Sequence, residues 1–241
     1  MIFYFSSTGN CKYVAEQISQ ATHDTAISIV DCLKQRKLQF PDTELLGIIS
    51  PTYAIGLPDI VDVFLRNLEI KSNYTFFIAT YGTTPGLTGY FAEQYLSNPI
   101  DAKFSIRMPD NFTPWFDLSN AGKVAQINEK ADKKLRKIID QIHSRETGNF
   151  MPIVPPVFVH RIHQPAYDSL RKTEHFHVES TCIGCGKCAA RCPVHAIQMK
   201  DRKPVWIKDK CTMCLGCLHH CPMFAIQYEN KTKEHGQYQH P

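Results

Sequence analysis

Two runs of four cysteines give this sequence its most specific chemistry. Each run has the spacing C-x2-C-x2-C-x3-C and is followed by a proline, Pro193 in the first run and Pro222 in the second. In this spacing the first three thiolates of a run bind one [4Fe–4S] cluster, and the fourth binds the other cluster. The predicted ligand sets are Cys182, Cys185, Cys188 and Cys221 for one cluster, and Cys211, Cys214, Cys217 and Cys192 for the other.

Structural zinc and disulfides are the alternatives for these cysteines. Zinc sites normally pair C-x2-C ligands across a longer loop, and disulfides are rare in a reducing cytosol. Gly184, Gly186 and Gly216 suit a backbone that curls closely around a cluster. His219 and His220 lie within the second run, and the available thiolates leave them as surface residues rather than ligands. Iron–sulfur clusters are therefore the favoured interpretation.

A second candidate site follows the apolar run of residues 1–5. Residues 6–11 separate this predicted strand from Val14, Ala15 and Ile18, which recur at helical spacing. Free backbone N–H groups and the helix dipole favour an anion at such a turn, and Gly9 permits a close backbone approach. A phosphate monoester would fit this turn. A plain helix cap is the alternative for the same residues.

The first 146 residues predict the sheet that must position this turn. Short apolar runs alternate with amphipathic stretches, which is typical of a parallel sheet covered by helices on both faces. We expect a five-stranded doubly wound α/β fold with right-handed crossovers. The predicted strands are residues 1–5, 26–30, 45–49, 74–80 and 104–108, and the predicted helices include residues 14–18, 58–68, 87–96 and 124–142.

Two further loops are expected beside the turn. Ligands of a doubly wound sheet bind at the carboxyl ends of its strands, next to the topological switch point. The third predicted strand runs into residues 50–58 and the fourth into residues 80–86, so both loops should meet residues 6–11 in one crevice. Tyr53 and Tyr81 lie in these loops as candidates for contact with a bound ring. Ordinary aromatic packing at strand ends is the alternative for both.

The remaining residues divide into three segments. Residues 147–180 are predicted as a connector, because Pro152, Pro155, Pro156 and Pro165 interrupt regular structure there. Within the connector, residues 167–176 are expected to form one short helix. Residues 181–228 form the cysteine-rich domain, and residues 229–241 form a polar tail that we expect to fray.

These motifs resemble two known families. Residues 181–228 resemble the bacterial two-cluster ferredoxins, and residues 1–142 resemble the flavodoxin-like family, which binds FMN. Together they resemble the flavodoxin–ferredoxin fusions called "ferrodoxin" family proteins.

The resemblance implies that Tyr53 is the first candidate for contact with the flavin ring and Tyr81 the second. Cys11 departs from the family's usual threonine or serine, because its thiol is a weaker hydrogen-bond donor. The implied FMN phosphate loop is Ser6, Ser7, Thr8, Gly9, Asn10 and Cys11, and the implied ring loops are Pro51, Thr52, Tyr53 and Ala54, with Tyr81, Gly82, Thr83 and Thr84.

The resemblance implies a redox flavoprotein that moves electrons between two [4Fe–4S] clusters and FMN. Because a flavin takes two electrons and each cluster carries one, the chain would link one-electron carriers to two-electron chemistry. No G-x-G-x-x-G follows a predicted strand, so the expected donor is a redox protein, either a ferredoxin or a ferredoxin-linked oxidoreductase, and not NAD(P)H.

Two other functions stay open at this point. One is an FMN-dependent reductase of a small-molecule acceptor. Residues 110–118 or the connector would then line a pocket over the flavin, whereas Trp115 and Phe116 could instead cover the flavin and leave no such pocket. The other is a redox sensor or interaction module without catalysis. A homodimer or a domain motion would be required if the flavin and the clusters lay far apart in one chain.

The formal charge of +4 belongs to the cysteine-rich half. Residues 1–150 carry 15 basic and 16 acidic side chains, whereas residues 151–241 carry 12 and 7. Each oxidised cluster adds about two negative charges, and an FMN phosphate adds about −1.5 to −2. The excess of basic residues is therefore interpreted as compensation for anionic cofactors rather than as a nucleic-acid site.

No run approaches the ~18 apolar residues of a membrane helix, so a cytoplasmic protein is expected.

Overall fold

A parallel sheet forms the first half of the molecule. The computed structural model describes residues 1–152 and 156–241. Its strand order is β2-β1-β3-β4-β5-β6, and every pairing in this sheet is parallel. The strands are β1 (Ile2–Tyr4), β2 (Ala26–Ser28), β3 (Thr43–Pro51), β4 (Ser72–Tyr81), β5 (Ala102–Arg107) and β6 (Gly148–Asn149). The doubly wound α/β fold is confirmed, with one correction: the two-residue β6, predicted as connector, extends the five expected strands to six.

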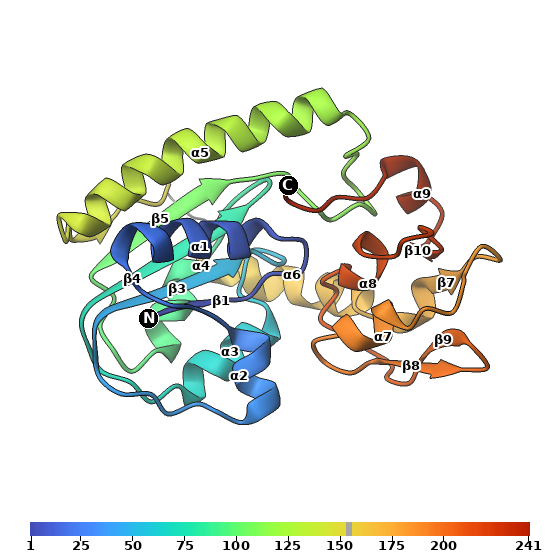
Figure 1. The fold of residues 1–241 in the computed structure, drawn as a ribbon, viewed down its shortest axis with the longest axis horizontal. Coiled ribbons are helices and arrows are strands. Elements are labelled where there is room, and N and C mark those ends of the chain that lie inside the picture. The colour runs from blue at the N-terminus through green and yellow to red at the C-terminus, as the bar shows by residue number, and fades with distance from the viewer. Residues whose placement is uncertain (153–155) are drawn as a thin grey trace.

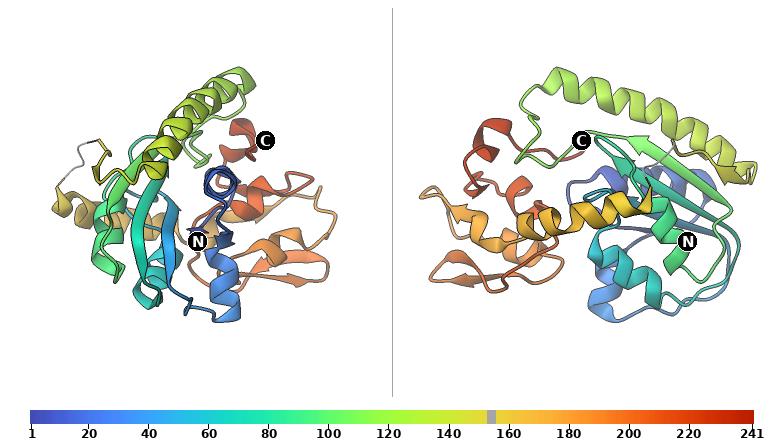
Figure 2. Two further views of the ribbon diagram at one scale, coloured as in Figure 1. Left: turned by 60° about the vertical axis from the view of Figure 1, so that its left-hand side comes forward. Right: turned by 180° about the vertical axis from the view of Figure 1, so that it is seen from behind.

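Helices cover both faces of the sheet, as Figures 1 and 2 show. One core joins α1 and α5 to the sheet, and the other joins α2, α3 and α4 to the opposite face. The helices are α1 (Asn10–Thr22), α2 (Ile29–Gln35), α3 (Asp59–Asn67), α4 (Thr88–Tyr95) and α5 (Ala121–His143). Residues 29 and 30 were predicted as strand but begin α2, because the Ser28 hydroxyl accepts a hydrogen bond from Asp31 N and caps the helix there.

The cysteine-rich half is a smaller α+β domain (Figure 1). It contains two antiparallel pairs, β7 with β10 and β8 with β9. Its core includes Phe176, Leu218 and Tyr228. The elements are β7 (Phe176–Val178), α7 (Lys187–Arg191), β8 (Ile197–Lys200), β9 (Lys203–Trp206), α8 (Gly216–His219) and β10 (Ile226–Tyr228).

The connector is more regular than its prolines predict. It contains α6 (Val157–Leu170), with Pro165 inside the helix, and a 3-10 turn, η1 (Thr173–His175). The short helix expected over residues 167–176 is therefore wrong, because the helix begins earlier and ends at Leu170. Pro155 lies outside the described residues. Figure 2 shows α6 extending from the sheet to the cysteine-rich domain.

The polar tail does not fray. Residues 232–235 form α9 (Thr232–His235), and the chain then returns to the beginning of α1. Tyr238 is only 5% exposed, and its hydroxyl donates to Asn10 Oδ1 over 2.7 Å. His240 N donates to Thr8 O over 2.8 Å, and the His240 ring stacks on Tyr13. The expectation of a frayed tail was wrong because these contacts reach across more than 200 residues of chain.

No helix in the described residues is both long enough and apolar enough to cross a membrane.

Candidate functional site

A cavity of about 320 Å³ lies where the carboxyl ends of β1, β3 and β4 meet the connector helix and the cysteine-rich domain. Three loops from the sheet line it, and they include every residue predicted for the flavin site except Gly9. Residues 109–112, Trp115 and Phe116 add a further wall, which agrees with the expectation for residues 110–118. The connector, which the sequence also indicated as an alternative wall, contributes His163, Ala166, Tyr167 and Leu170 of α6. The lining that the sequence did not indicate is Met213 and Leu215 of the cysteine-rich domain.

The turn after β1 has the geometry of an anion site. Gly9 has φ 106°, a left-handed conformation that suits glycine, and it directly precedes α1. The first N–H groups of the helix have no partners within the helix and point out of its N-terminal end. Side chains from the β5–α5 loop support the turn, since Asn111 Nδ2 donates to Thr8 Oγ1 over 2.7 Å and Asn10 Nδ2 donates to Pro109 O over 3.3 Å.

Cys11 contacts the sheet. Its sulfur lies 3.1 Å from Thr80 Oγ1, and burial raises the pKa of the thiol to about 12. Cys11 is thus a neutral, buried group at neutral pH. The thiol therefore adds no negative charge at the beginning of α1.

The two ring loops are held by close backbone contacts. Ala54 and Ile55 have positive φ values of 44° and 70°, and Leu87 N donates to Ile55 O over 2.6 Å, which joins the loop after β3 to the loop after β4. Tyr53 lies beside residues 6–11, the turn predicted to hold a phosphate, which we call the phosphate turn. Its hydroxyl is 3.4 Å from Ser7 Oγ. Burial raises the pKa of Tyr53, so its hydroxyl stays protonated. Tyr81 also lines the cavity.

Asp110 is the acidic side chain of the cavity wall. Its carboxylate accepts hydrogen bonds from Thr83 Oγ1 and Phe112 N, both over 3.2 Å. Burial nevertheless raises the pKa of Asp110, because desolvation outweighs these two bonds. The carboxylate orders the loop after β4 against the β5–α5 loop.

The eight cysteines of the second domain gather in two groups of four. Each group lines a small cavity of about 20 Å³. The fourth cysteine of each run lines the cavity of the other run, which is the grouping that the spacing predicts. The first cavity is lined by Cys182, Cys185, Cys188 and Cys221, and the second by Cys192, Cys211, Cys214 and Cys217.

The donor chemistry of these groups fits an iron–sulfur cluster. Backbone N–H groups point at the sulfurs, with Ala196 N 3.2 Å from Cys192, Met213 N 3.3 Å from Cys211 and Ala225 N 3.2 Å from Cys221. Burial raises the pKa of Cys211 to about 11 and that of Cys214 to about 12. In the described part of the chain, no three His, Cys, Asp or Glu side chains are arranged around a single metal ion.

The second cysteine cavity adjoins the large cavity. Leu215 lines both cavities, and Met213 also faces the large one. Cys214 packs into the same apolar cluster as Tyr53. A Cβ atom at Gly216 would lie only 3.7 Å from Ser7 O, so the cysteine loop lies directly on the phosphate turn.

The two histidines of the second run hold this contact. His219 Nε2 donates to Asn111 O and His220 Nε2 donates to Ser7 O, each over 2.8 Å. His219 is fully buried, so its assignment to the surface was wrong. Its Nδ1 accepts from Tyr238 N, and burial lowers the pKa of His219 to about 4, which keeps the ring neutral. Nothing in the local sequence indicates these contacts, because their partners lie in the other domain.

Residues 1–137, more than half of the chain, match the flavodoxin domain family. The chain belongs to the flavodoxin domain family. Residues 175–236 match a 4Fe–4S dicluster domain. Among curated proteins, Ferredoxin-1 of Rhodospirillum rubrum is 58% identical over 26 residues, which are 11% of this chain and 47% of that ferredoxin. The match thus spans about half the length of the ferredoxin. No solved structure matches the chain.

The flavodoxin domain and the ferredoxin domain therefore share one chain, and both are of a redox type. A flavodoxin domain implies FMN, and a 4Fe–4S domain implies iron–sulfur. The large cavity of the flavodoxin domain and the cysteine groups of the ferredoxin domain have the donor chemistry that these groups require.

Proposed function

We propose that this protein transfers electrons between two [4Fe–4S] clusters and FMN, and so links one-electron carriers to two-electron flavin chemistry. When bound, the flavin would supply storage for two electrons, accepted one at a time, and each cluster would carry one. The supporting observation is that one side chain, Leu215, lines both the large cavity and the second cysteine cavity. The two sites are close enough within one chain that the proposal requires no second copy.

In this proposal, residues 6–11 hold the FMN phosphate through the N-terminus of α1. Residues 51–54 and 81–84 flank the flavin ring, with Tyr53 as its principal contact. The supporting features are the positive φ of Gly9 and the position of all three loops around one cavity. The contact of the Tyr53 hydroxyl with Ser7 holds the loop after β3 beside the phosphate turn.

The cysteines hold the clusters in two crossed sets. Cys182, Cys185, Cys188 and Cys221 hold the outer cluster, and Cys192, Cys211, Cys214 and Cys217 hold the inner cluster, which is the one beside the flavin. The crossed sets are supported by the two cavities that they line. Because burial raises the pKa of the Cys211 and Cys214 thiols, these two are protonated when free, and binding of the inner cluster displaces their protons.

The size of the large cavity favours a carrier over a reductase of a small molecule. About 320 Å³ lies at the lower end of the ~300–1,000 Å³ typical of ligand pockets, so one bound cofactor would fill it. Phe116, Tyr167 and Leu170 line the cavity on the side of the connector and the β5–α5 loop, where they narrow the space beside a bound cofactor. We therefore expect an external redox protein, and not a small substrate, at the other end of the electron path.

The test begins with anaerobic purification and with iron, sulfide and FMN counts per chain. We expect about eight irons, eight sulfides and one FMN. Zinc in place of iron, or failure to take up FMN, would contradict the proposal. After photoreduction of the clusters, FMN absorbance should bleach without any added acceptor. Cys214→Ser should block this bleaching, whereas Cys32→Ser, a buried cysteine in the flavodoxin domain, should leave it intact.

A further inference from the structure

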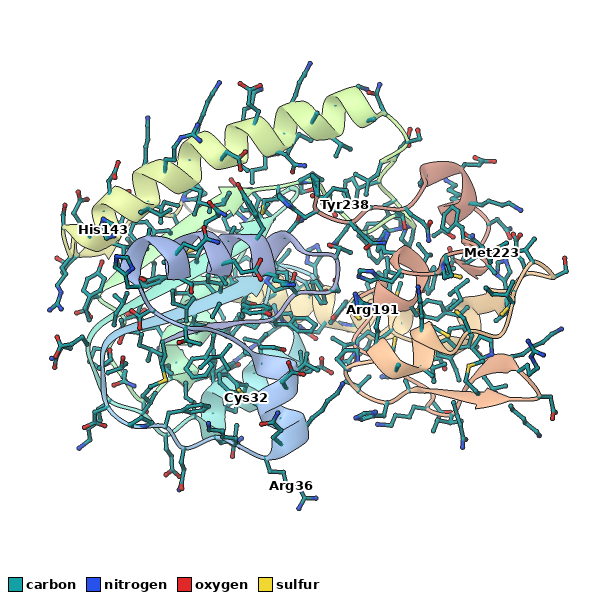
Figure 3. The ribbon with its side chains drawn as sticks, in the orientation of Figure 1. Cys32, Arg36, His143, Arg191, Met223 and Tyr238 are labelled. Carbon is teal, nitrogen blue, oxygen red and sulfur yellow. The ribbon has the colours of Figure 1, made fainter. Side chains whose placement is uncertain are left out.

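The outer cysteine cavity reaches the surface on the side away from the flavodoxin domain. Cys185 is exposed. Two large apolar side chains on the rim of the same cavity are also exposed, Ile183 at 53% and Met223 at 44%. Figure 3 shows Met223 at the end of the ferredoxin domain remote from the sheet. Of the two cysteine sets, the outer one is therefore the more exposed, because the inner set contains no exposed cysteine.

The inner cavity lies beside the flavodoxin domain. Its cysteine loop lies on Ser7, and His219 and His220 seal the junction through hydrogen bonds to the flavodoxin domain. Cys192 of the inner set is buried. A partner protein can approach the ferredoxin domain most closely at the outer cavity.

Basic side chains surround the exposed apolar rim. The β8–β9 hairpin places Met199 and Pro204 against the outer cavity and pairs Lys200 with Lys203. Arg202, in the hairpin turn, packs its backbone on Gly184, and Lys187 lines the cavity itself. All the Lys, Arg and Asp side chains of residues 181–210 are exposed; they are Lys187, Arg191, Lys200, Arg202, Lys203, Lys208 and Lys210, with Asp201 and Asp209 as the acidic members.

The charge of this rim is unbalanced locally. Lys187, Lys200, Arg202 and Lys203 form no ion pair with the described residues. Asp201 is the acidic neighbour in the hairpin turn, and the Glu179 carboxylate at the other edge is paired with Lys233. Arg191 lies nearer the flavodoxin domain, as Figure 3 shows. The four basic side chains outweigh the single negative charge of Asp201, so the rim keeps a net charge of about +1 after the about two negative charges of an oxidised outer cluster are counted.

We propose that this face, an apolar centre ringed by Lys187, Lys200, Arg202 and Lys203, docks an acidic one-electron carrier protein. The proposal rests on the proposed function, which makes the outer cysteine set a redox centre. One electron leaves the reduced carrier and is accepted at the outer set, so the carrier is oxidised, the outer centre is reduced, and no bond forms or breaks. Opposite charge steers such an encounter, and a small apolar centre permits rapid release.

A second copy of the chain fits this face less well. The flavodoxin domain has nearly equal numbers of acidic and basic residues, 16 and 15 within residues 1–150, so it offers no strongly acidic counterpart. The same basic rim on a second copy offers no negative counterpart, so two such faces do not attract each other. A separate carrier of net negative charge is the complementary occupant.

The test uses a charge-reversed hairpin in the holoprotein, Lys200→Glu/Arg202→Glu/Lys203→Glu. Lys200 and Lys203 are cross-strand partners. When both are replaced, the pair still consists of two like charges, so we expect the pairing of β8 with β9 to stay unchanged. The matched control is Lys130→Glu/Lys134→Glu/Lys137→Glu, which places the same charge change on the exposed face of α5. The probe is an acidic two-cluster ferredoxin, reduced beforehand and mixed by stopped flow at two salt concentrations.

At low salt we expect the hairpin variant to accept electrons about tenfold or more slowly than the parent protein, and the control variant to stay within about twofold. At high salt the three rates should converge, because screening removes the steering. Equal slowing of both variants, or no slowing of either, would overturn the proposal. Loss of self-association, or of nucleic-acid binding, in the hairpin variant without a change in the rate of electron transfer would overturn it as well.

A second readout separates this proposal from the proposed function. A photoreduced neutral deazaflavin does not depend on docking, so it should reduce the clusters of all three proteins at the same rate. If the clusters are reduced but FMN then stays oxidised, the proposed function fails. If FMN bleaches in the dark while the clusters lose their electrons after a brief flash of deazaflavin photoreduction, and only the carrier reaction is slowed in the hairpin variant, both proposals hold.

Discussion

Gly9 is the residue at which the phosphate turn and the C-terminal segment touch. Its φ of 106° strains any residue with a side chain, and an added Cβ would lie 2.9 Å from His240 Cβ. We predict that Gly9→Ala destabilises the fold by about 1–3 kcal/mol and weakens FMN binding. Urea unfolding and a flavin fluorescence titration measure the two effects.

Gly122→Ala is the control for this change. Gly122 lies near the beginning of α5 and has an ordinary φ, and an added Cβ would meet only Asn120 Oδ1 at 3.4 Å. Because alanine has the higher helix propensity, we expect unchanged stability or a gain of up to ~1 kcal/mol. Equal losses in both variants would contradict the role assigned to Gly9.

Cys192 tests the crossed ligand sets at the level of one sulfur atom. It belongs to the first run by sequence but lines the cavity of the second run. We predict that Cys192→Ser damages the inner cluster, leaves the outer cluster intact and stops reduction of the flavin. Iron and sulfide counts with EPR of the reduced protein provide the measurement, and loss of the outer cluster alone would contradict the crossed sets.

The cysteine sets could be predicted from the sequence because the spacing along a tight loop fixes which sulfurs share a site. The burial of His219 could not be predicted in this way. Its partners, Asn111 and Tyr238, come together only when the two domains and the tail have packed. When the partners of a polar residue are distant in the chain, the sequence around that residue does not indicate that it is buried.

The C-terminal segment, residues 236–241, is an element without regular structure that holds the phosphate turn from outside. Figure 3 shows Tyr238 beside the beginning of α1. We predict that Tyr238→Phe costs about 1–2 kcal/mol, because the buried Asn10 Oδ1 loses its donor. FMN affinity should fall by about five- to thirtyfold if that free energy is lost from the flavin-bound state.

Tyr90→Phe is the comparison for this prediction, since Tyr90 is 41% exposed on α4. It should change neither thermal stability nor the dissociation constant of FMN. An unchanged FMN affinity in Tyr238→Phe would show that the segment supports the fold without supporting the cofactor site.

The elements of the flavodoxin domain were predicted more successfully than those of the connector. Strands such as β4 are continuous apolar runs, which are visible without any knowledge of the rest of the chain. The connector helix α6 contains Pro165 and has no fully buried side chain, so neither propensity nor periodicity indicates it. Its Tyr167 and Leu170 pack at the large cavity, and that tertiary contact compensates for a weak helical sequence.

At the scale of the whole molecule, Asp59 joins the two domains. Its carboxylate accepts from Thr212 Oγ1 over 3.0 Å and pairs with Arg171, whose Nε donates to Cys211 O over 2.8 Å. The pair thus connects the beginning of α3, the connector and the inner cysteine loop.

We predict that Asp59→Asn loosens this junction. An amide would turn an N–H toward Arg171 or Thr212, so the free energy of unfolding should fall by about 1–2 kcal/mol. Transfer from the clusters to FMN should slow severalfold, while direct reduction of the outer cluster stays unchanged. Asp62→Asn, on the same helix in an exposed pair with Arg66, should cost at most ~0.5 kcal/mol. Similar kinetics in the two variants would contradict the role of Asp59.

The path of the chain also sets an order of assembly. The phosphate turn is built from residues 6–11, which leave the ribosome early, whereas Tyr238 and His240, which pack against it, are synthesised after the whole ferredoxin domain. The contacts of Tyr238 and His240 with this turn therefore form only after the ferredoxin domain has been synthesised. Under the proposed function, clusters bound in that domain stabilise it, so we expect retention of the flavin to depend on the supply of iron. A cell short of iron would then accumulate this chain without its flavin.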